Sequence, residues 1–216
     1  MLDEVQTILV IDDHPLMRKG ILQLIAMEDS LRVVGEAGDA QQGLALARQL
    51  QPDLILLDLN MRGMSGQELL EILKAEDTDA RVIILTVSDN EEDVVAALRA
   101  GADGYLLKDM EPEAVLDSLK IAAQGRMVLG ERVAEILADA LRHETRPRPA
   151  DSARLTERER EILSHIATGL SNKLIARELK ITEGTVKVHV KHLLRKLDLG
   201  SRVEAAVWAV KHGFRK

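Results

Sequence analysis

The residue with the clearest chemical potential is Asp58, which follows the apolar run Leu54–Leu57 and precedes a loop containing Gly63 and Gly66. A carboxylate at the end of a buried strand is costly unless a neighbouring group uses or neutralises it. A carboxylate can also attack a phosphoryl group as a nucleophile. We therefore predict that Asp58 accepts a phosphoryl group.

Three other apolar runs of strand length end in polar groups that could meet Asp58. Asp12 and Asp13 follow the first run, Thr86 ends the fourth, and Lys108 follows the fifth. Neighbouring carboxylates repel by about 1 to 4 kcal/mol, depending on the dielectric, and a hard divalent cation such as Mg²⁺ relieves that repulsion. Lys108 and the cation would offset the charge on the transferring oxygens. The Thr86 hydroxyl would donate a hydrogen bond to the bound phosphate.

Each of these residues also has a plainer explanation. A single Asp or Thr after a strand is commonly a turn or helix-cap residue, and a single Lys is commonly solvated. The joint placement of an acid pair, a further acid, a hydroxyl and a lysine at successive strand ends is harder to explain in this way. We therefore favour a phosphoacceptor site.

The elements that must position these groups follow from the pattern of residues 1–125, where apolar runs and helical periodicity alternate five times. Several runs are continuous in Val, Ile and Leu, as expected for strands covered on both faces. The alternation predicts an α/β fold with a five-stranded, doubly wound parallel sheet, whose ligand site lies at the carboxyl ends of the strands. The predicted strands are Thr7–Ile11, Arg32–Glu36, Leu54–Leu57, Val82–Thr86 and Tyr105–Leu107.

The charges of the chain are divided unevenly. Residues 1–125 hold 10 Lys and Arg against 24 Asp and Glu, whereas residues 126–216 hold 19 against 12. This asymmetry suggests that only the second half meets nucleic acid, although two ordinary domains can also differ by chance.

Composition also limits the class of protein. The absence of cysteine excludes disulfides and thiolate metal sites and fits a cytoplasmic location. The N-terminus is acidic and the apolar runs are short. We therefore expect neither a signal peptide nor a membrane span.

Residues 126–154 are predicted to connect two domains. The spacing of apolar residues predicts an amphipathic helix over Glu131–Leu141. A flexible linker follows, because the stretch around Pro147 and Pro149 is charged and lacks large apolar residues. Its arginines could touch DNA, but solvation is the simpler explanation.

Residues 155–216 are predicted to form a smaller all-α domain of four helices. Thr156 and Glu159 form a capping box at the start of the first helix, and Ser171, Thr182 and Ser201 begin the others. Short helices joined by a tight turn are typical of the helix-turn-helix.

The third of these helices has two distinct faces. One is apolar and belongs in the core; it carries Val186, Val190, Leu193 and Leu197. The opposite face is basic, with an apolar residue at its centre; it includes Lys187, Val188 and Lys191. Lysines can contact guanine edges or phosphates, and a valine can contact a thymine methyl group. A basic face alone could simply be solvated, but the exposed valine favours DNA reading.

The constellation at the strand ends resembles the receiver domain of bacterial response regulators, over roughly residues 5–125. The resemblance implies a role for each matching residue. Asp58 would be the phosphoacceptor, and Lys108 would be the lysine that contacts phosphate. The Mg²⁺ ligands would be Asp13, Asp58 and the backbone carbonyl of Asn60, with Asp12 close by or acting through water. Thr86 and Tyr105 would be paired switch residues.

The chain departs from the receiver pattern at Arg62, where the family has a proline. Proline fixes φ and stiffens the loop, so Arg62 leaves the loop freer and adds a positive charge near the site. We expect this difference to affect phosphate lifetime and partner docking.

The second domain closely resembles the LuxR-type helix-turn-helix, through Leu155-Thr156-x-Arg158-Glu159, Asn172-Lys173-x-Ile175-Ala176 and Thr185-Val186-Lys187-x-His189. With the receiver, the chain is identified as a member of the NarL/FixJ family. The resemblance implies that Lys173, Arg177, Thr182 and Thr185 hold the DNA backbone and that Lys187, Val188 and Lys191 face the bases.

The family resemblance also implies partners: a cognate sensor histidine kinase, double-stranded promoter DNA and a second copy of the chain on DNA. RNA polymerase is a further candidate partner. Val203, Val207 and Val210 lie on one face of the last helix. They would either form the dimer seam or complete the core.

Two other functions compete with a phosphorylation-controlled, non-enzymatic transcription factor. A Mg²⁺-dependent phosphatase would use Asp58 as a turnover nucleophile, and it predicts a second acid two residues later, where the chain has Asn60. A DNA-binding regulator that is independent of phosphate would leave the acidic pocket without a purpose.

Overall fold

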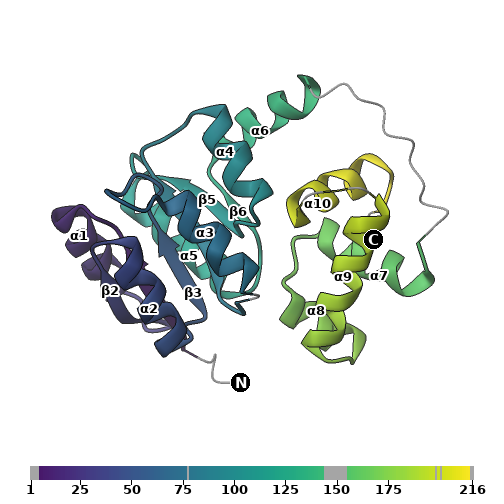
Figure 1. The fold of residues 1–216 in the computed structure, drawn as a ribbon, viewed down its shortest axis with the longest axis horizontal. Coiled ribbons are helices and arrows are strands. Elements are labelled where there is room, and N and C mark those ends of the chain that lie inside the picture. The colour runs from purple at the N-terminus through teal and green to yellow at the C-terminus, as the bar shows by residue number, and fades with distance from the viewer. Residues whose placement is uncertain (1–4, 77, 144–154, 198, 200, 215–216) are drawn as a thin grey trace. The chain divides into compact units, whose positions relative to one another are not determined.

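The computed structural model describes residues 5–76, 78–143, 155–197, 199 and 201–214 (Figure 1). It divides into two compact units. The first consists of Met1–Gln124 and Val128–Ala140, and the second of Gly125–Met127 and Leu141–Lys216. The predicted linker over residues 144–154 lies outside the described residues.

The first unit is built on a parallel sheet, which confirms the predicted α/β class. In the described residues the strand order is β2-β1-β3-β4-β5-β6, and every neighbouring pair is parallel. The strands are β1 (Gln6–Ile11), β2 (Leu31–Ala37), β3 (Leu54–Leu57), β4 (Arg81–Thr86), β5 (Gly104–Leu107) and β6 (Val128–Leu129). From β1 the chain adds β2 on one side, and it then adds β3 to β6 on the other side of β1. A switch point therefore lies between β1 and β3.

The predicted number of strands was wrong, because the described sheet has six strands rather than five. β6 has two residues, and it pairs with β5 in the register Gly104↔Val128 and Tyr105↔Leu129. A two-residue strand has no period of its own, so its pairing is decided by the edge of β5. Residues 128–140, which the sequence assigned to the connector, belong to the same compact unit as the sheet.

Helices cover both faces of the sheet (Figure 1). The covering helices are α1 (Pro15–Ile25), α2 (Ala40–Leu50), α3 (Gly66–Ala75), α4 (Glu91–Arg99) and α5 (Pro112–Ala123), and α6 (Glu131–His143) follows β6. On one face, Ile25 of α1 and Leu119 of α5 join alternate strand residues such as Ile8 and Leu56 in one aliphatic core. On the other face α3 contacts α2 and α4. Burial on both faces explains why the strands are almost uniformly apolar.

The second unit contains, among its described residues, the four predicted helices: α7 (Glu157–Ala167), α8 (Asn172–Leu179), α9 (Glu183–Leu197) and α10 (Arg202–Lys211). The predicted caps are confirmed. Thr156 and Glu159 form both bonds of the capping box, Ser171 and Ser201 accept backbone N–H groups, and Thr182 accepts from the N–H of Thr185 at 3.1 Å. Three helices surround a small aliphatic core that also receives Ala205 and Ala209 of α10.

Within the described part of the chain, no helix combines the length and apolarity that crossing a bilayer requires.

Candidate functional site

The carboxyl ends of β1, β3 and β5 bring Asp12, Asp58 and Lys108 into direct contact. Nζ of Lys108 lies 2.7 Å from Oδ2 of Asp58 and 2.8 Å from Oδ2 of Asp12. The three side chains are 5%, 1% and 5% exposed for Lys108, Asp58 and Asp12. Buried charges are tolerated when they are paired and hydrogen-bonded. A single ammonium group therefore holds together two carboxylates that would otherwise repel.

Asn60 connects Asp58 to Thr86. Its backbone N–H donates to Oδ1 of Asp58 at 3.2 Å, and its side-chain amide donates to Oγ1 of Thr86 at 3.2 Å. Thr86 is fully buried at the end of β4. Its hydroxyl oxygen also lies 3.4 Å from the donating N–H of Ser88. The roles of the Asn60 carbonyl as a metal ligand and of Thr86 as a phosphate donor stay predictions.

The two predicted switch residues meet through Ser88, which the sequence did not single out. The hydroxyl of Tyr105 donates to the carbonyl oxygen of Ser88 at 2.8 Å, while the N–H of Ser88 donates to Thr86. Burial of the Tyr105 ring raises the pKa of its phenol well above the ordinary value of 10, and the nearby charge of Asp93 raises it further. Tyr105 is therefore a neutral donor at neutral pH.

The acids at this edge fit a hard divalent cation. Ligand atoms of Asp12, Asp13, His14 and Asp58 all lie within 4.8 Å of one another. Oδ1 of Asp13 is buried and accepts no hydrogen bond from the described residues. A buried carboxylate oxygen without a donor is costly, and a cation among these oxygens would remove that cost. Carboxylates and water are the ligands that Mg²⁺ prefers.

His14 and Arg18 belong to the site, although the sequence analysis did not select them. Nδ1 of His14 lies 2.9 Å from Oδ1 of Asp13. Nη1 of Arg18 donates to the carbonyl of Asp12 at 2.6 Å, and its Nε donates to Glu36 at 2.7 Å. The position of His14 directly after the acid pair could have signalled its presence, because the strand end places three successive residues near the site.

The loop after β3 is held close to Asp58 by Gly66. A Cβ added at Gly66 would lie 1.9 Å from the backbone oxygen of Asp58, so only glycine allows α3 to begin there. In the same loop the exposed Arg62 donates its backbone N–H to Oδ2 of Asp13 at 3.3 Å. A proline at this position would lack that donor.

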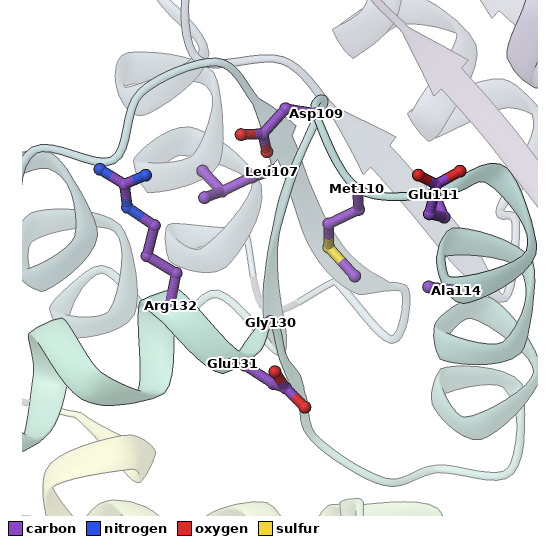
Figure 2. A pocket seen from close by; sticks show the side chains of 8 residues that line it. All are labelled: Leu107, Asp109, Met110, Glu111, Ala114, Gly130, Glu131 and Arg132. Atoms are coloured by element: carbon purple, nitrogen blue, oxygen red, sulfur yellow. The ribbon is translucent and has the colours of Figure 1, made fainter.

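A hollow of about 310 Å³ adjoins the end of β5 (Figure 2). Its walls come from β5, the start of α5 and the first turn of α6; they are formed by Leu107, Asp109, Met110, Glu111, Ala114, Gly130, Glu131 and Arg132. Arg132 also forms an ion pair with Asp89, in the loop that follows Thr86. None of the predicted site residues lines this hollow.

The residues selected as a DNA-reading face lie on one side of the helix-turn-helix. Val186, Val190, Leu193 and Leu197 are buried, as predicted. Val188 is 54% exposed, Lys191 is exposed and Lys187 is half-buried. The residues predicted to hold the DNA backbone are also exposed, namely Lys173, Arg177, Thr182 and Thr185. An exposed valine among lysines has no packing role in the described unit, so this face is available to a ligand.

The start of α9 is organised by its own hydroxyls. Oγ1 of Thr182 and Oγ1 of Thr185 lie 2.8 Å apart. The other end of α9 is tied to α7, since Nζ of Lys196 donates to Glu159 at 2.7 Å. Burial alone would raise the pKa of the Glu159 carboxyl, but the Lys196 ammonium and the Thr156 donors more than offset it and hold the pKa below the ordinary value of 4.5. The basic face is therefore fixed at both ends of its helix.

Comparison with known proteins assigns each unit. Residues 8–120 match the family model of the response regulator receiver domain. Residues 153–209 match the family described as bacterial regulatory proteins of the luxR family. Each match covers one of the two sites just described.

Similarity extends over nearly the whole chain. The nitrate/nitrite response regulator NarL of Escherichia coli K12 is 57% identical over 205 residues, which are 95% of each chain. The nitrate/nitrite response regulator NarP of the same strain is 48% identical over 200 residues, covering 93% of this chain and 92% of its own. The solved structure of ChrA, the response regulator of a heme-sensing two-component system, shares 35% identity and a TM-score of 0.53, and it covers 99% of this chain and 100% of its own.

Proposed function

Since this chain belongs to the two-component response regulators that join a receiver domain to a LuxR-type DNA-binding domain, we propose that phosphorylation of Asp58 controls its binding to promoter DNA. The observation that carries this proposal is the buried contact of Lys108 with both Asp58 and Asp12. A lysine that already contacts the acceptor carboxylate can form an ion pair with a phosphoryl group once that group is bound to the same carboxylate.

In the proposed transfer, a sensor histidine kinase presents a phosphohistidine. A carboxylate oxygen of Asp58 attacks the phosphorus, and the bond from phosphorus to the histidine nitrogen breaks as the new bond to oxygen forms. Lys108 moves with the developing charge and donates to a phosphoryl oxygen. Asp12 and Asp13 would hold Mg²⁺, with Asp58 and the Asn60 carbonyl completing the set. The bound ion would neutralise charge on the phosphoryl oxygens.

The switch follows from the bonds around Ser88. A phosphoryl group adds close to two negative charges and draws the Lys108 ammonium and the Thr86 hydroxyl towards it. Thr86 now accepts from Asn60 and from Ser88, so turning its hydroxyl to the phosphate alters the loop that also accepts the Tyr105 hydrogen bond. A change at Asp58 thereby reaches the outer end of β5.

The output is DNA binding by the face of α9. Lys187, Val188 and Lys191 read the bases, while Lys173, Arg177, Thr182 and Thr185 hold the backbone. All of them except the half-buried Lys187 are exposed, and this exposure supports both roles. The chain binds as a homodimer, which suits paired half-sites; Val210, 40% exposed on α10, is available to a dimer seam. RNA polymerase is a candidate partner of the bound dimer.

The signal is proposed to be nitrate or nitrite, received by the partner kinase. The support is the likeness to NarL and NarP, both named nitrate/nitrite response regulators. No residue of this chain is assigned to sensing nitrate.

The protein is proposed to be a regulator rather than a phosphatase. A turnover phosphatase of this kind needs an acid two residues after the nucleophile to protonate the leaving group. That position is Asn60, whose side-chain amide donates to Thr86. Steady hydrolysis of small phosphate esters would contradict the proposal.

The test compares Asp58→Asn with the control Asp109→Asn, which changes an exposed acid next to Lys108. Each full-length variant is incubated with Mg²⁺ and a small phosphodonor, and intact mass and promoter binding are measured. We expect wild type and Asp109→Asn to gain one phosphoryl group and bind DNA more tightly, and Asp58→Asn to do neither. Phosphorylation of Asp58→Asn to the wild-type level would refute the assignment.

A further inference from the structure

The helix α8 has little apolar surface of its own to fix its position in the second unit. It is eight residues long, and of these only Ile175 and Ala176 are buried. Helices this short are marginal in water and depend on contacts with their surroundings. Two of the residues proposed to hold the DNA backbone, Lys173 and Arg177, lie exposed on this helix. Contacts at its two ends are therefore important for where those side chains lie.

Arg202, the first residue of α10, contacts the start of α8. Its Nη1 atom donates to Oδ1 of Asn172 at 2.9 Å, and its Nη2 atom donates to the carbonyl oxygen of Leu170. These acceptors lie on either side of Ser171, the N-cap of α8, whose hydroxyl accepts the N–H of Leu174 at 3.3 Å. One guanidinium group thus bridges the residue before the cap and the residue after it. Because α10 packs mainly against α7 and α9, a long side chain is needed to reach α8.

Arg158 of α7 contacts the other end of α8. Its Nη2 atom donates at 3.0 Å to the carbonyl oxygen of Leu179, the last residue of the helix, and its Nη1 atom donates to Glu161 at 2.7 Å. The last carbonyl groups of a helix have no partner within it. Arginine donates to two acceptors through a rigid planar fork, whereas lysine carries one compact ammonium on a flexible stem. Arg158 and Arg202 together form what we call the α8 clamp.

We propose that the α8 clamp positions Lys173 and Arg177 for contact with the DNA backbone. The clamp holds a short helix at both ends from two neighbouring helices, so it sets the tilt and rotation of α8 relative to α9. Its two arginines are positioning residues, which act through α8 and need no contact with DNA themselves. This inference rests on the proposed function, because it assigns a purpose to the orientation of the two DNA-contacting side chains.

The test uses double-mutant cycles in the full-length chain, treated with Mg²⁺ and a small phosphodonor and titrated with promoter DNA. Arg158→Lys and Arg202→Lys keep the positive charge but lose the fork. We expect each to weaken binding to all DNA sequences by about fivefold, the loss expected for one hydrogen bond. Arg48→Lys, which changes an exposed ion pair of the first unit, should leave DNA affinity unchanged.

Coupling to Lys173 distinguishes positioning from a direct contact with DNA. When either clamp variant is combined with Lys173→Ala, the loss of affinity should fall short of the product of the single losses by about threefold or more. The reason is that the contact that the clamp positions is already absent. When either is combined with Lys191→Ala on α9, the losses should multiply to within about twofold.

Hydrogen exchange measured without DNA tests the clamp separately. We expect Arg202→Lys to speed amide exchange in α8 about fivefold more than in α9. Unchanged exchange in α8 would overturn the inference. Losses that multiply with Lys173→Ala would also overturn it, because a direct DNA contact or a general loss of stability acts independently of Lys173. A wild-type chain that binds no DNA, with the exchange result intact, would overturn the proposed function and leave the clamp of α8 standing.

Discussion

At the scale of single residues, Lys108 carries the electrostatic balance of the receiver pocket. It contacts two carboxylates that belong to different strands, and all three groups are almost fully buried. The two acids therefore share one positive charge, which offsets their mutual repulsion. His14 lies on the exposed side of the same acids.

Replacing Lys108 by Ala should leave Asp12 and Asp58 buried and unpaired. Removing one partner of a buried ion pair costs about 3 to 5 kcal/mol, so we expect a loss of that size in the free energy of unfolding, measured by circular dichroism in denaturant with EDTA. Mg²⁺ at 100 times its Kd would restore about 2.7 kcal/mol. The control Lys120→Ala breaks an exposed pair with Asp117 and should change the free energy of unfolding far less, because solvent screens exposed pairs. Equal losses in the free energy of unfolding for Lys108→Ala and Lys120→Ala would contradict the role given to Lys108.

At the scale of elements, one buried acid joins two helices of the second unit, α7 and α9. Glu159 caps α7 and also accepts from Lys196 of α9. It is therefore part of both a helix end and a contact between helices, which positions the basic face of α9.

The stability of the second unit should fall in acid because of Glu159. The folded protein holds the pKa of this carboxyl below 4.5, so the unfolded chain takes up the proton first as the pH falls. Its contribution is complete above about pH 4.5 and is lost as the pH falls through the lower, folded pKa. Fluorescence of Trp208, the single tryptophan, reports unfolding of this unit. We expect a weaker acid dependence in Glu159→Gln and an unchanged one in Glu178→Gln, an exposed control; an unchanged dependence in Glu159→Gln would exclude this role.

In the first unit, an ion pair links α6 to the loop that contains Ser88. Arg132 of α6 pairs with Asp89, one residue after Ser88. Both side chains are largely exposed, at 64% and 42%, so the pair contributes at most about 1 kcal/mol.

Charge reversal tests that link. We expect Arg132→Glu to speed hydrogen exchange in the first turns of α6 by up to about fivefold, the factor equivalent to 1 kcal/mol. The double reversal Arg132→Glu with Asp89→Arg should restore the wild-type rate, as read by mass spectrometry. No recovery in the double variant would show that the two residues act separately.

At the scale of the whole molecule, the division of charge assigns different partners to the two units. The acidic first half suits a cation, and residues 126–216 carry an excess of positive charge that suits DNA. Phosphate contacts make DNA affinity depend on salt, with a slope of about 0.9 per contact.

Two lysines of the second unit should therefore fail in different ways. Lys173→Ala should weaken binding to all DNA sequences alike and reduce the slope of log affinity against log salt by about one. Lys191→Ala should relax sequence preference, at a cost of about 1 to 3 kcal/mol for the preferred site. Lys211→Ala, on α10, serves as a charge-matched control. A loss of sequence preference in Lys173→Ala would reverse the assigned roles.

The sequence alone determined the α/β class, the strands that carry the pocket, the four helices of the second unit and the polar side chains that gather at the strand ends. Periodicity reports which face of an element is buried, and parallel strands collect the polar residues at their carboxyl ends. Asp58, Lys108 and the exposed Val188 could be selected for that reason. Receiver and LuxR-type motifs then assigned the family.

The tertiary structure decided what periodicity does not encode. β6 exists because the edge of β5 accepts two residues, and Ser88 joins Thr86 to Tyr105 because a loop folds between two strand ends. The contact of His14 with the acids depends on where one exposed ring lies after β1. These contacts depend on how separate elements are placed relative to one another. Their free energy is set by distances in the folded structure, which the periodicity of the sequence does not report.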